Sequence, residues 1–343
     1  MSDTAKRAGV FLGVFVLAVT VGALALGGGG QSAPAVDEVN ASAFNTDDAV
    51  ASVPEETGEV SMSEDGSGNT VVVDTTRSQR ITPESLAPMA NALTESGATV
   101  RFTGRASSAA RYGTGGLNES LQSADAYVVF GAKQPYTDAE LAGLKAFTDA
   151  GGRVLVLNEP QRQAPRILSL LGGSSMSAGA PSPLVPLTSE YGVTYNNGYL
   201  YNMADNSNNY RNVYATPAGD SALTEGVERT VFHESVSVTG GESVLTATEG
   251  TELSATRRAD TYPVLTRSDN LVAVGDTSVM SQEYVYRADN EVLVGNLLDF
   301  LVSGEKSPED APSSGSGGGF GGGGVGGSSG GGSAEPTRTP TLP

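Results

Sequence analysis

The sequence contains no cysteine and no tryptophan, and its only histidine among 343 residues is His233. Without cysteine there is no disulfide, no thiol nucleophile and no thiolate metal ligand. Nucleophilic catalysis would have to use His233 as its base, and a lone histidine is more often structural than catalytic. The chain also lacks a Gly-x-Ser-x-Gly motif, a P-loop and a dinucleotide fingerprint. The sequence therefore argues against an enzyme and predicts neither a metal site nor a cofactor.

Basic residues are scarce as well. Twenty Lys and Arg stand against 39 Asp and Glu, which gives a formal net charge of −19 at pH 7. So acidic a surface repels nucleic acid and anionic lipid headgroups, which sets both aside as partners. An acidic shell of this kind is typical of a protein adapted to high salt, where ions screen its self-repulsion.

One long apolar run, residues 8–26, follows Lys6 and Arg7. As a helix it spans roughly 28 Å, close to the roughly 30 Å hydrocarbon thickness of a bilayer. Because the basic residues precede it, the positive-inside rule predicts a single-pass anchor with residues 1–7 in the cytoplasm and the domain outside. The alternative is a secretory signal cleaved near Ala23-Leu24-Ala25. We favour the anchor, because the run is long for a signal peptide.

The regions that flank the domain have low-complexity composition. Residues 27–69 are rich in Gly, Ala, Ser, Asp and Glu, and residues 305–343 are mostly Gly, Ser and Pro. Such segments cannot bury enough apolar surface to order themselves. The sequence therefore predicts a flexible acidic stalk, a folded domain over residues 70–304, and a disordered tail.

The domain is organised around residues 124–160. Two continuously apolar runs, 126–130 and 154–157, are separated by a helical pattern that opens at Tyr136-Thr137-Asp138. This arrangement is typical of a parallel βαβ unit that is buried on both faces.

Further strands and helices are expected on both sides of this unit. Strands are expected at 71–74, 100–102, 230–232, 244–247, 264–267 and 271–274, and helices at 83–97, 117–121, 165–171 and 289–304. The alternation predicts an α/β fold with a doubly wound, mostly parallel, flavodoxin-like sheet. The Tyr- and Asn-rich stretch 191–214 is expected to be an inserted loop or small β subregion.

Polar residues at the predicted strand ends, or at the start of the last helix, are the candidates for binding a ligand or partner. They are Asp74, Arg77, Asn158, Glu159, Asp276, Asp289 and Asn290. The competing interpretation is that these residues cap helices and satisfy loop amides, and Asp289-Asn290 is expected to cap the last helix. The loop 205–209 superficially resembles half of a calcium loop, but Tyr210 and Thr216 occupy its Gly and Glu positions.

Several motifs together resemble the domain of unknown function 4350, a family found in halophilic archaea and in bacteria. They are Val71 to Asp74, Tyr136-Thr137 with Glu140-Leu141, Gly151 to Pro160, Tyr199 to Asn202, Asn209 to Tyr214, Val272 to Asp276, and Asp289 to Glu291. The resemblance implies a core similar to the class I glutamine amidotransferase-like fold. It implies no amidotransferase activity, since the nucleophilic Cys is absent. Family members often accompany membrane-associated ATPase and assembly proteins, which implies a role in a surface or maturation complex.

Two functional hypotheses follow. The first is a non-catalytic, membrane-anchored extracytoplasmic domain that binds a partner protein or polar ligand. The second is a hydrolase that acts on cell-surface glycan or peptide through carboxylates such as Glu159 and Asp276, which would have to face each other across an open cleft.

Overall fold

The structure is a computed structural model, and it describes residues 57–75, 81–103, 116–132, 134–160 and 182–307. The expected membrane segment 8–26, the expected short helix 165–171, the candidate Arg77 and most of the tail lie outside these residues. Within the described ranges, no helix is long and apolar enough to span a bilayer.

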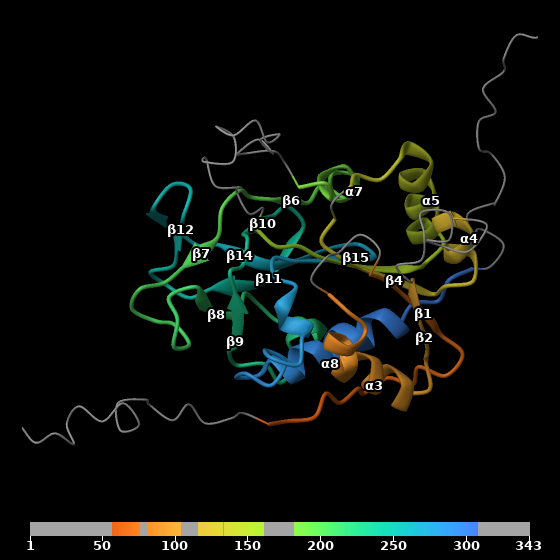
Figure 1. The fold of residues 1–343 in the computed structure, drawn as a ribbon, viewed down its shortest axis with the longest axis horizontal. Helices are drawn as coiled ribbons and strands as arrows, with labels where there is room; N and C mark the ends of the chain where they lie inside the picture. Colours follow the sequence, from red (N-terminus) through yellow and green to blue (C-terminus); the bar gives the residue numbers. More distant parts are fainter. Residues whose placement is uncertain (1–56, 76–80, 104–115, 133, 161–181, 308–343) are drawn as a thin grey trace, which may run out of the picture. The chain divides into compact units, whose positions relative to one another are not determined.

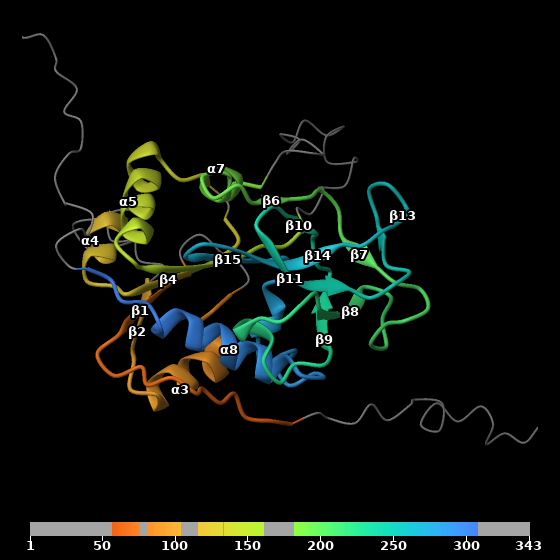
Figure 2. The same ribbon diagram turned by 180° about the vertical axis from the view of Figure 1, so that it is seen from behind.

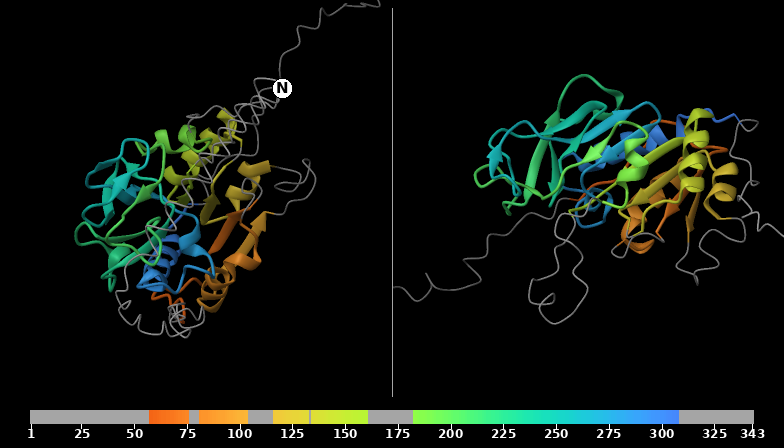
Figure 3. Two further views of the ribbon diagram at one scale, coloured as in Figure 1. Left: turned by 60° about the vertical axis from the view of Figure 1, so that its left-hand side comes forward. Right: turned by 90° about the horizontal axis from the view of Figure 1, so that it is seen from above.

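A nine-stranded sheet forms the centre of the domain, in the order β2-β1-β4-β5-β15-β14-β11-β8-β9. Its parallel strands are β1 (Thr70–Asp74), β2 (Thr99–Thr103), β4 (Ala126–Phe130), β5 (Arg153–Leu157) and β15 (Leu271–Val274). Each later neighbour runs antiparallel: β14 (Pro263–Ser268), β11 (Glu242–Ala247), β8 (Asn212–Pro217) and β9 (Thr230–His233). The sheet is therefore mixed with a parallel core, which corrects the expectation of a mostly parallel sheet. Figure 3 shows the two halves at opposite ends of the sheet.

Part of the antiparallel half arises from the stretch that was expected to be an insertion. β8 begins inside it and pairs with both β11 and β9, so it belongs to the main sheet. Its sequence buries Val213 and Ala215 on one face, a two-residue period that is too short to stand out among the surrounding Tyr and Asn. Short strands form two smaller sheets beside it: β6 (Thr194–Tyr195), β7 (Leu200–Tyr201), β10 (Val238–Thr239), β12 (Glu252–Leu253) and β13 (Arg258–Ala259).

Helices cover both faces of the parallel core (Figures 1 and 2). On one face lie α3 (Ala87–Glu95) and α8 (Asn290–Val302), and on the other α4 (Gly116–Gln122), α5 (Asp138–Asp149) and α7 (Val185–Ser189). The short 3-10 helices are η2 (Glu84–Leu86), η3 (Ala222–Thr224) and η4 (Ser278–Met280). Successive side chains of β1 point to opposite faces, so that Val71 and Val73 join one apolar cluster and Val72 the other. This explains why the parallel strands are apolar throughout.

The expected βαβ unit is confirmed by β4, α5 and β5. Thr137 begins α5 through a capping box, in which its side chain accepts from the Glu140 amide while the Glu140 carboxylate accepts from the Thr137 amide. The turn into β5 fits under the Phe147 ring, since a Cβ on Gly152 would lie 2.5 Å from a ring atom. Local sequence therefore sets both the start and the end of this unit.

After β9 the chain crosses the end of β15, although three strands separate the two in the sheet. Val236 N donates to Gly275 O at 2.7 Å, and Gly275 N donates to Val264 O at 2.8 Å. The backbones approach so closely that a Cβ on Gly275 would lie 2.0 Å from Val236 O. The carboxyl ends of β9 and β15 are thereby joined at one edge of the sheet.

We expect Gly275→Ala to lower the free energy of unfolding by about 1–3 kcal/mol, because its Cβ meets a backbone carbonyl that has little room to move. Gly219→Ala is the matched control, because Gly219 is exposed and a Cβ there meets nothing within 4 Å. Urea unfolding measures both variants. Equal stabilities for the two would contradict the close approach.

Candidate functional site

The carboxyl ends of β5, β9 and β15 meet at one edge, and Asp276 lies at the centre of this edge. Its carboxylate is buried and accepts hydrogen bonds from His233 N at 2.7 Å, Ser278 N at 2.7 Å and Ser278 Oγ. Burial raises the pKa of Asp276 to about 7, although these three donors oppose the rise. Asp276 thus joins β9 to the start of η4 and titrates near neutrality.

Two other expected site residues lie beside Asp276, at the end of β5. The Glu159 carboxylate accepts from the hydroxyl of Thr277, the residue after Asp276. Asn158 is buried, and its Oδ1 accepts from Ser182 Oγ at 3.2 Å. The structure therefore brings Asn158, Glu159 and Asp276 together, as expected for neighbouring parallel strands.

Asp74 lies elsewhere along the same edge. It is buried at the end of β1, three strand spacings from β15, which corresponds to roughly 14 Å. Its carboxylate accepts from Tyr127 Oη at 2.7 Å and Thr103 Oγ1 at 3.1 Å, and Tyr136 Oη lies 3.1 Å from Tyr127 Oη. These contacts tie β1 to its two neighbours, so Asp74 does not share a site with Asp276.

Asp289 and Asn290 do not cap α8 with their side chains, which corrects the sequence-based expectation. The Asp289 carboxylate accepts from the amides of Glu228 and Arg229, both at 2.8 Å. Asn290 exchanges two hydrogen bonds with the backbone of Val231, each 2.9 Å long. The backbone of Asp289 is not extended, as that of a capping residue usually is, so its side chain meets the chain entering β9 instead. Both residues fix β9 against α8.

His233, which the sequence analysis treated as structural, ends β9 beside Asp276. Its Nδ1 lies 2.7 Å from Asn212 Oδ1, and Asn212 Nδ2 donates to Ser207 O at 2.8 Å. Because that second bond fixes the orientation of the amide, Nδ1 of His233 carries the proton and Nε2 presents a lone pair. No acceptor or donor for Nε2 exists among the described residues. The ring stacks on Tyr284 with centroids 5.0 Å apart.

Burial lowers the pKa of His233. The carboxylates of Glu234, Glu283 and Glu159 oppose this, and Arg287 adds to it. The imidazole is therefore neutral at pH 7 while several carboxylates lie nearby. The only feature of the sequence that pointed to a site at His233 was the polar pair His233-Glu234 directly after an apolar strand.

The residue after His233 has an unusual backbone. Glu234 has a φ of +47°, a left-handed conformation that costs a side-chain-bearing residue about 1–2 kcal/mol. Its amide donates to Arg211 O, and its carboxylate pairs with the Arg211 guanidinium. That guanidinium also lies over the rings of Tyr199 and Tyr210, 4.7 and 5.3 Å from their centroids. The edge thus continues into an aromatic surface.

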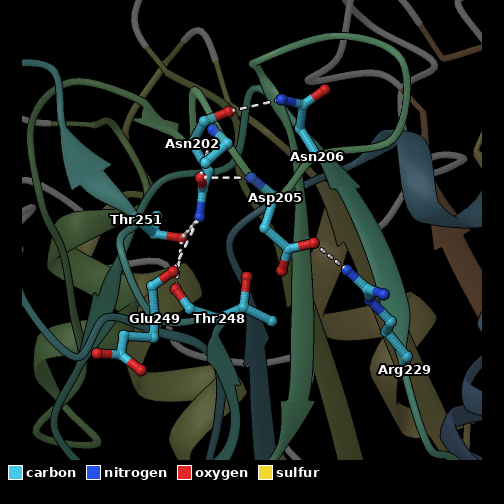
Figure 4. Close-up of polar contacts among 8 residues, drawn as sticks. Asn202, Asp205, Asn206, Arg229, Thr248, Glu249 and Thr251 are labelled. Carbon is cyan, nitrogen blue, oxygen red and sulfur yellow. Dashed lines mark hydrogen bonds and ion pairs between the residues drawn. The ribbon is translucent and has the colours of Figure 1, made fainter.

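This surface is supported by a segment that we call the outer lobe, which consists of residues 196–211 and 248–262. Figure 4 shows the Asn202 side chain, which is buried, with its bonded partners in this lobe. Nδ2 donates to Glu249 O at 3.1 Å and Thr251 Oγ1 at 3.2 Å, and Oδ1 accepts from the amides of Ala204 and Asp205. The Asp205 carboxylate pairs with Arg229. The loop that superficially resembled a calcium site is therefore a polar turn held by Asn202.

We expect Asn202→Asp to destabilise the protein by about 1–3 kcal/mol, because a carboxylate cannot donate to Glu249 O. Asn197→Asp is the matched control: Asn197 is exposed in the same lobe, and its side chain makes no hydrogen bond to another described residue. Urea unfolding distinguishes them, and equal losses would contradict the role of the Asn202 amide.

The titration of Asp276 predicts how stability depends on pH. Its folded pKa is raised from 3.8 to about 7, so the folded protein holds a proton that the unfolded chain has lost. This stabilisation is present at low pH and is lost as the pH rises through about 7. Between pH 5 and 7, the unfolding free energy of the wild type should fall by on the order of 2 kcal/mol relative to Asp276→Asn. Urea unfolding measures this difference. If the unfolding free energies of the two proteins change with pH in the same way, the Asp276 carboxyl group has its ordinary pKa.

The architecture is similar to that of several solved structures. The mmIFT52 N-terminal domain superimposes with a TM-score of 0.51 over 69% of this chain and 99% of that domain, at 14% sequence identity. No family model and no curated protein matches the chain. At this identity the likeness shows the fold alone, an α/β domain with a mixed sheet and a parallel core.

Proposed function

We propose that the domain is a non-catalytic binding module that receives a cationic side chain, Lys or Arg, from a partner protein. The receiving site is the edge where β5, β9 and β15 end. The observation that supports this best is His233, whose Nδ1 proton is committed to Asn212 while Nε2 keeps a lone pair. A neutral, fixed imidazole accepts a hydrogen bond from an ammonium or guanidinium group.

The charges around His233 favour the same ligand. Glu159, Glu234 and Glu283 each raise the pKa of His233, and among the described residues Arg287 lowers it. Arg211 forms an ion pair with Glu234. A positive side chain that approaches this edge therefore gains Coulomb energy, and it gains most where the edge is partly buried.

The outer lobe adds an apolar contact surface beside the charged one. Met203 is 72% exposed and Tyr210 39%, and Arg211 lies between two Tyr rings. Tyr, Arg and Met are enriched in protein interfaces, where rigid aromatic side chains contribute most of the affinity. This composition favours a protein partner over a small polar ligand.

A hydrolase that uses Glu159 and Asp276 is the weaker proposal. Asp276 is 1% exposed, and its two oxygens already accept three hydrogen bonds. A glycosidase needs both carboxylates to reach the scissile bond from an open cleft. Asp276 serves the fold instead.

The cellular setting is proposed from the sequence alone. Residues 8–26 would anchor the domain outside the membrane as a single span, or would be removed as a secretory signal. From its motifs we also propose that the domain is similar to the domain of unknown function 4350, with an amidotransferase-like core. This similarity suggests that the basic partner belongs to a membrane-associated assembly.

The single histidine makes the proposal directly testable by proton NMR on the full chain, since one imidazole resonance reports on the site. Acetyl-Lys-Lys-amide, titrated at constant ionic strength, should shift the His233 resonance and lower its apparent pKa, because a donor on Nε2 competes with protonation. Glu159→Gln should weaken this binding several-fold by removing a nearby carboxylate.

Glu249→Gln is the control, because Glu249 is exposed and only its backbone carbonyl is used in the outer lobe. It should leave the lysine peptide's affinity unchanged. If acetyl-Glu-Glu-amide shifts the resonance equally, or if Glu249→Gln weakens binding as much as Glu159→Gln does, the proposed site is wrong.

A further inference from the structure

A groove of about 770 Å³ runs along α8, away from the edge that holds His233. Arg153 and Arg267 line one part of it, and five acidic residues line the rest: Glu59, Glu64, Glu225, Glu291 and Asp299. Arg153 begins β5 and Arg267 lies near the end of β14, so both are at the amino-terminal edge of the parallel strands. The volume lies within the range of ligand-binding clefts.

The two guanidinium groups lie against one aromatic ring. Arg153 Cζ lies 4.9 Å and Arg267 Cζ 5.4 Å from the centroid of Phe300, a buried residue of α8. Both side chains are partly exposed. Burial and the charge of Arg267 lower the pKa of Arg153. Two positive charges are thus held close together, because both side chains lie against the ring of Phe300.

The orientation of each arginine is fixed by one bond. Asn270 Nδ2 donates to Thr148 O at 2.9 Å, which turns its Oδ1 toward Arg153 Nη1. Arg267 Nε donates to Asp269 O at 3.2 Å. In the described part of the chain, Arg153 Nη2 and both Nη groups of Arg267 have no acceptor. These donors remain for a ligand.

Neither arginine forms an ion pair with another described residue. The ion pairs among the described residues involve Lys145, Arg211 and Arg229, and neither Arg153 nor Arg267. The nearby end of α8 does not use their donors either, because the Asp299 and Phe300 carbonyls accept from Ser303 N and Ser303 Oγ. In a chain with a net charge of −19, two guanidinium groups that lie against one ring without an ion pair to another described residue are unusual.

We propose that Arg153 and Arg267 form a binding site for one oxyanion group, a carboxylate or a phosphate, at the end of the α8 groove. Paired guanidinium groups with fixed orientation bind such oxygens through several charge-assisted hydrogen bonds. The ligand removes the repulsion between the two arginines when it binds. The site is independent of the one at His233, because it lies at the opposite edge of the parallel core.

Isothermal titration of the full chain at constant ionic strength tests this with two probes, inorganic phosphate and acetyl-Glu-Glu-amide. Arg267→Gln should raise the dissociation constant of the bound probe at least tenfold, and Arg153→Gln should do the same. Arg267→Lys should weaken binding less, since it keeps the charge and loses the forked donors. Phosphate binding alone identifies a phosphorylated ligand, and peptide binding alone identifies an acidic protein segment.

Arg258→Gln is the control, because Arg258 is exposed on β13, outside the groove, and its side chain bonds no other described residue. It should bind both probes as the wild type does. Urea unfolding verifies that the variants fold. If Arg153→Gln does not fold, the affinity of Arg267→Gln decides the test. The proposal fails if the wild type binds neither probe, or if Arg258→Gln loses as much affinity as Arg267→Gln.

Discussion

The carboxylate of Asp276 holds two distant strands of the sheet together. It accepts the amide of His233 from the end of β9 and the amide of Ser278 from the start of η4, and it is buried while doing so. Removing it would leave buried donors without acceptors, each at a cost of about 1–3 kcal/mol. The backbone contact between Gly275 and Val236 closes the same junction. The position of every group at this edge depends on that junction.

The same junction sets the electrostatics of the edge. Burial raises the pKa of Asp276 to about 7 and lowers the pKa of His233 below its ordinary value. His233 is placed by its own backbone amide and by Asn212, and it therefore cannot turn away from the neighbouring carboxylates. The junction between the ends of β9 and β15 thus holds His233, a neutral hydrogen-bond acceptor, among acidic groups.

The two edges of the parallel core differ in character. The carboxyl ends carry Glu159, Asp276 and His233, whereas the amino ends carry Arg153 and Arg267 beside α8. A parallel sheet separates its two sets of loops by the length of its strands, so two sites of opposite charge can coexist without neutralising each other. In this acidic chain the separation keeps the acidic groups around His233 apart from the two arginines beside α8.

Local patterns were sufficient to predict several elements. The apolar runs of β4 and β5 and the start of a helix at Tyr136-Thr137-Asp138 are short-range features, and all were recognisable from the sequence. Glu159 lies beside the residue that follows Asp276, because neighbouring parallel strands end at one edge. Asp74 was expected there as well, but strand order places it apart, and no local pattern encodes strand order.

The sequence by itself determined the α/β class, the apolar core strands and the acidic charge, because these follow from composition and from periods of two and 3.6 residues. Only the tertiary structure decided that β8 enters the main sheet, that Asp289 and Asn290 bond β9 instead of capping α8, and that His233 meets Asp276. Each of these contacts joins residues that are at least 15 positions apart. Such contacts depend on how the whole chain packs, and a residue's near neighbours carry little information about them.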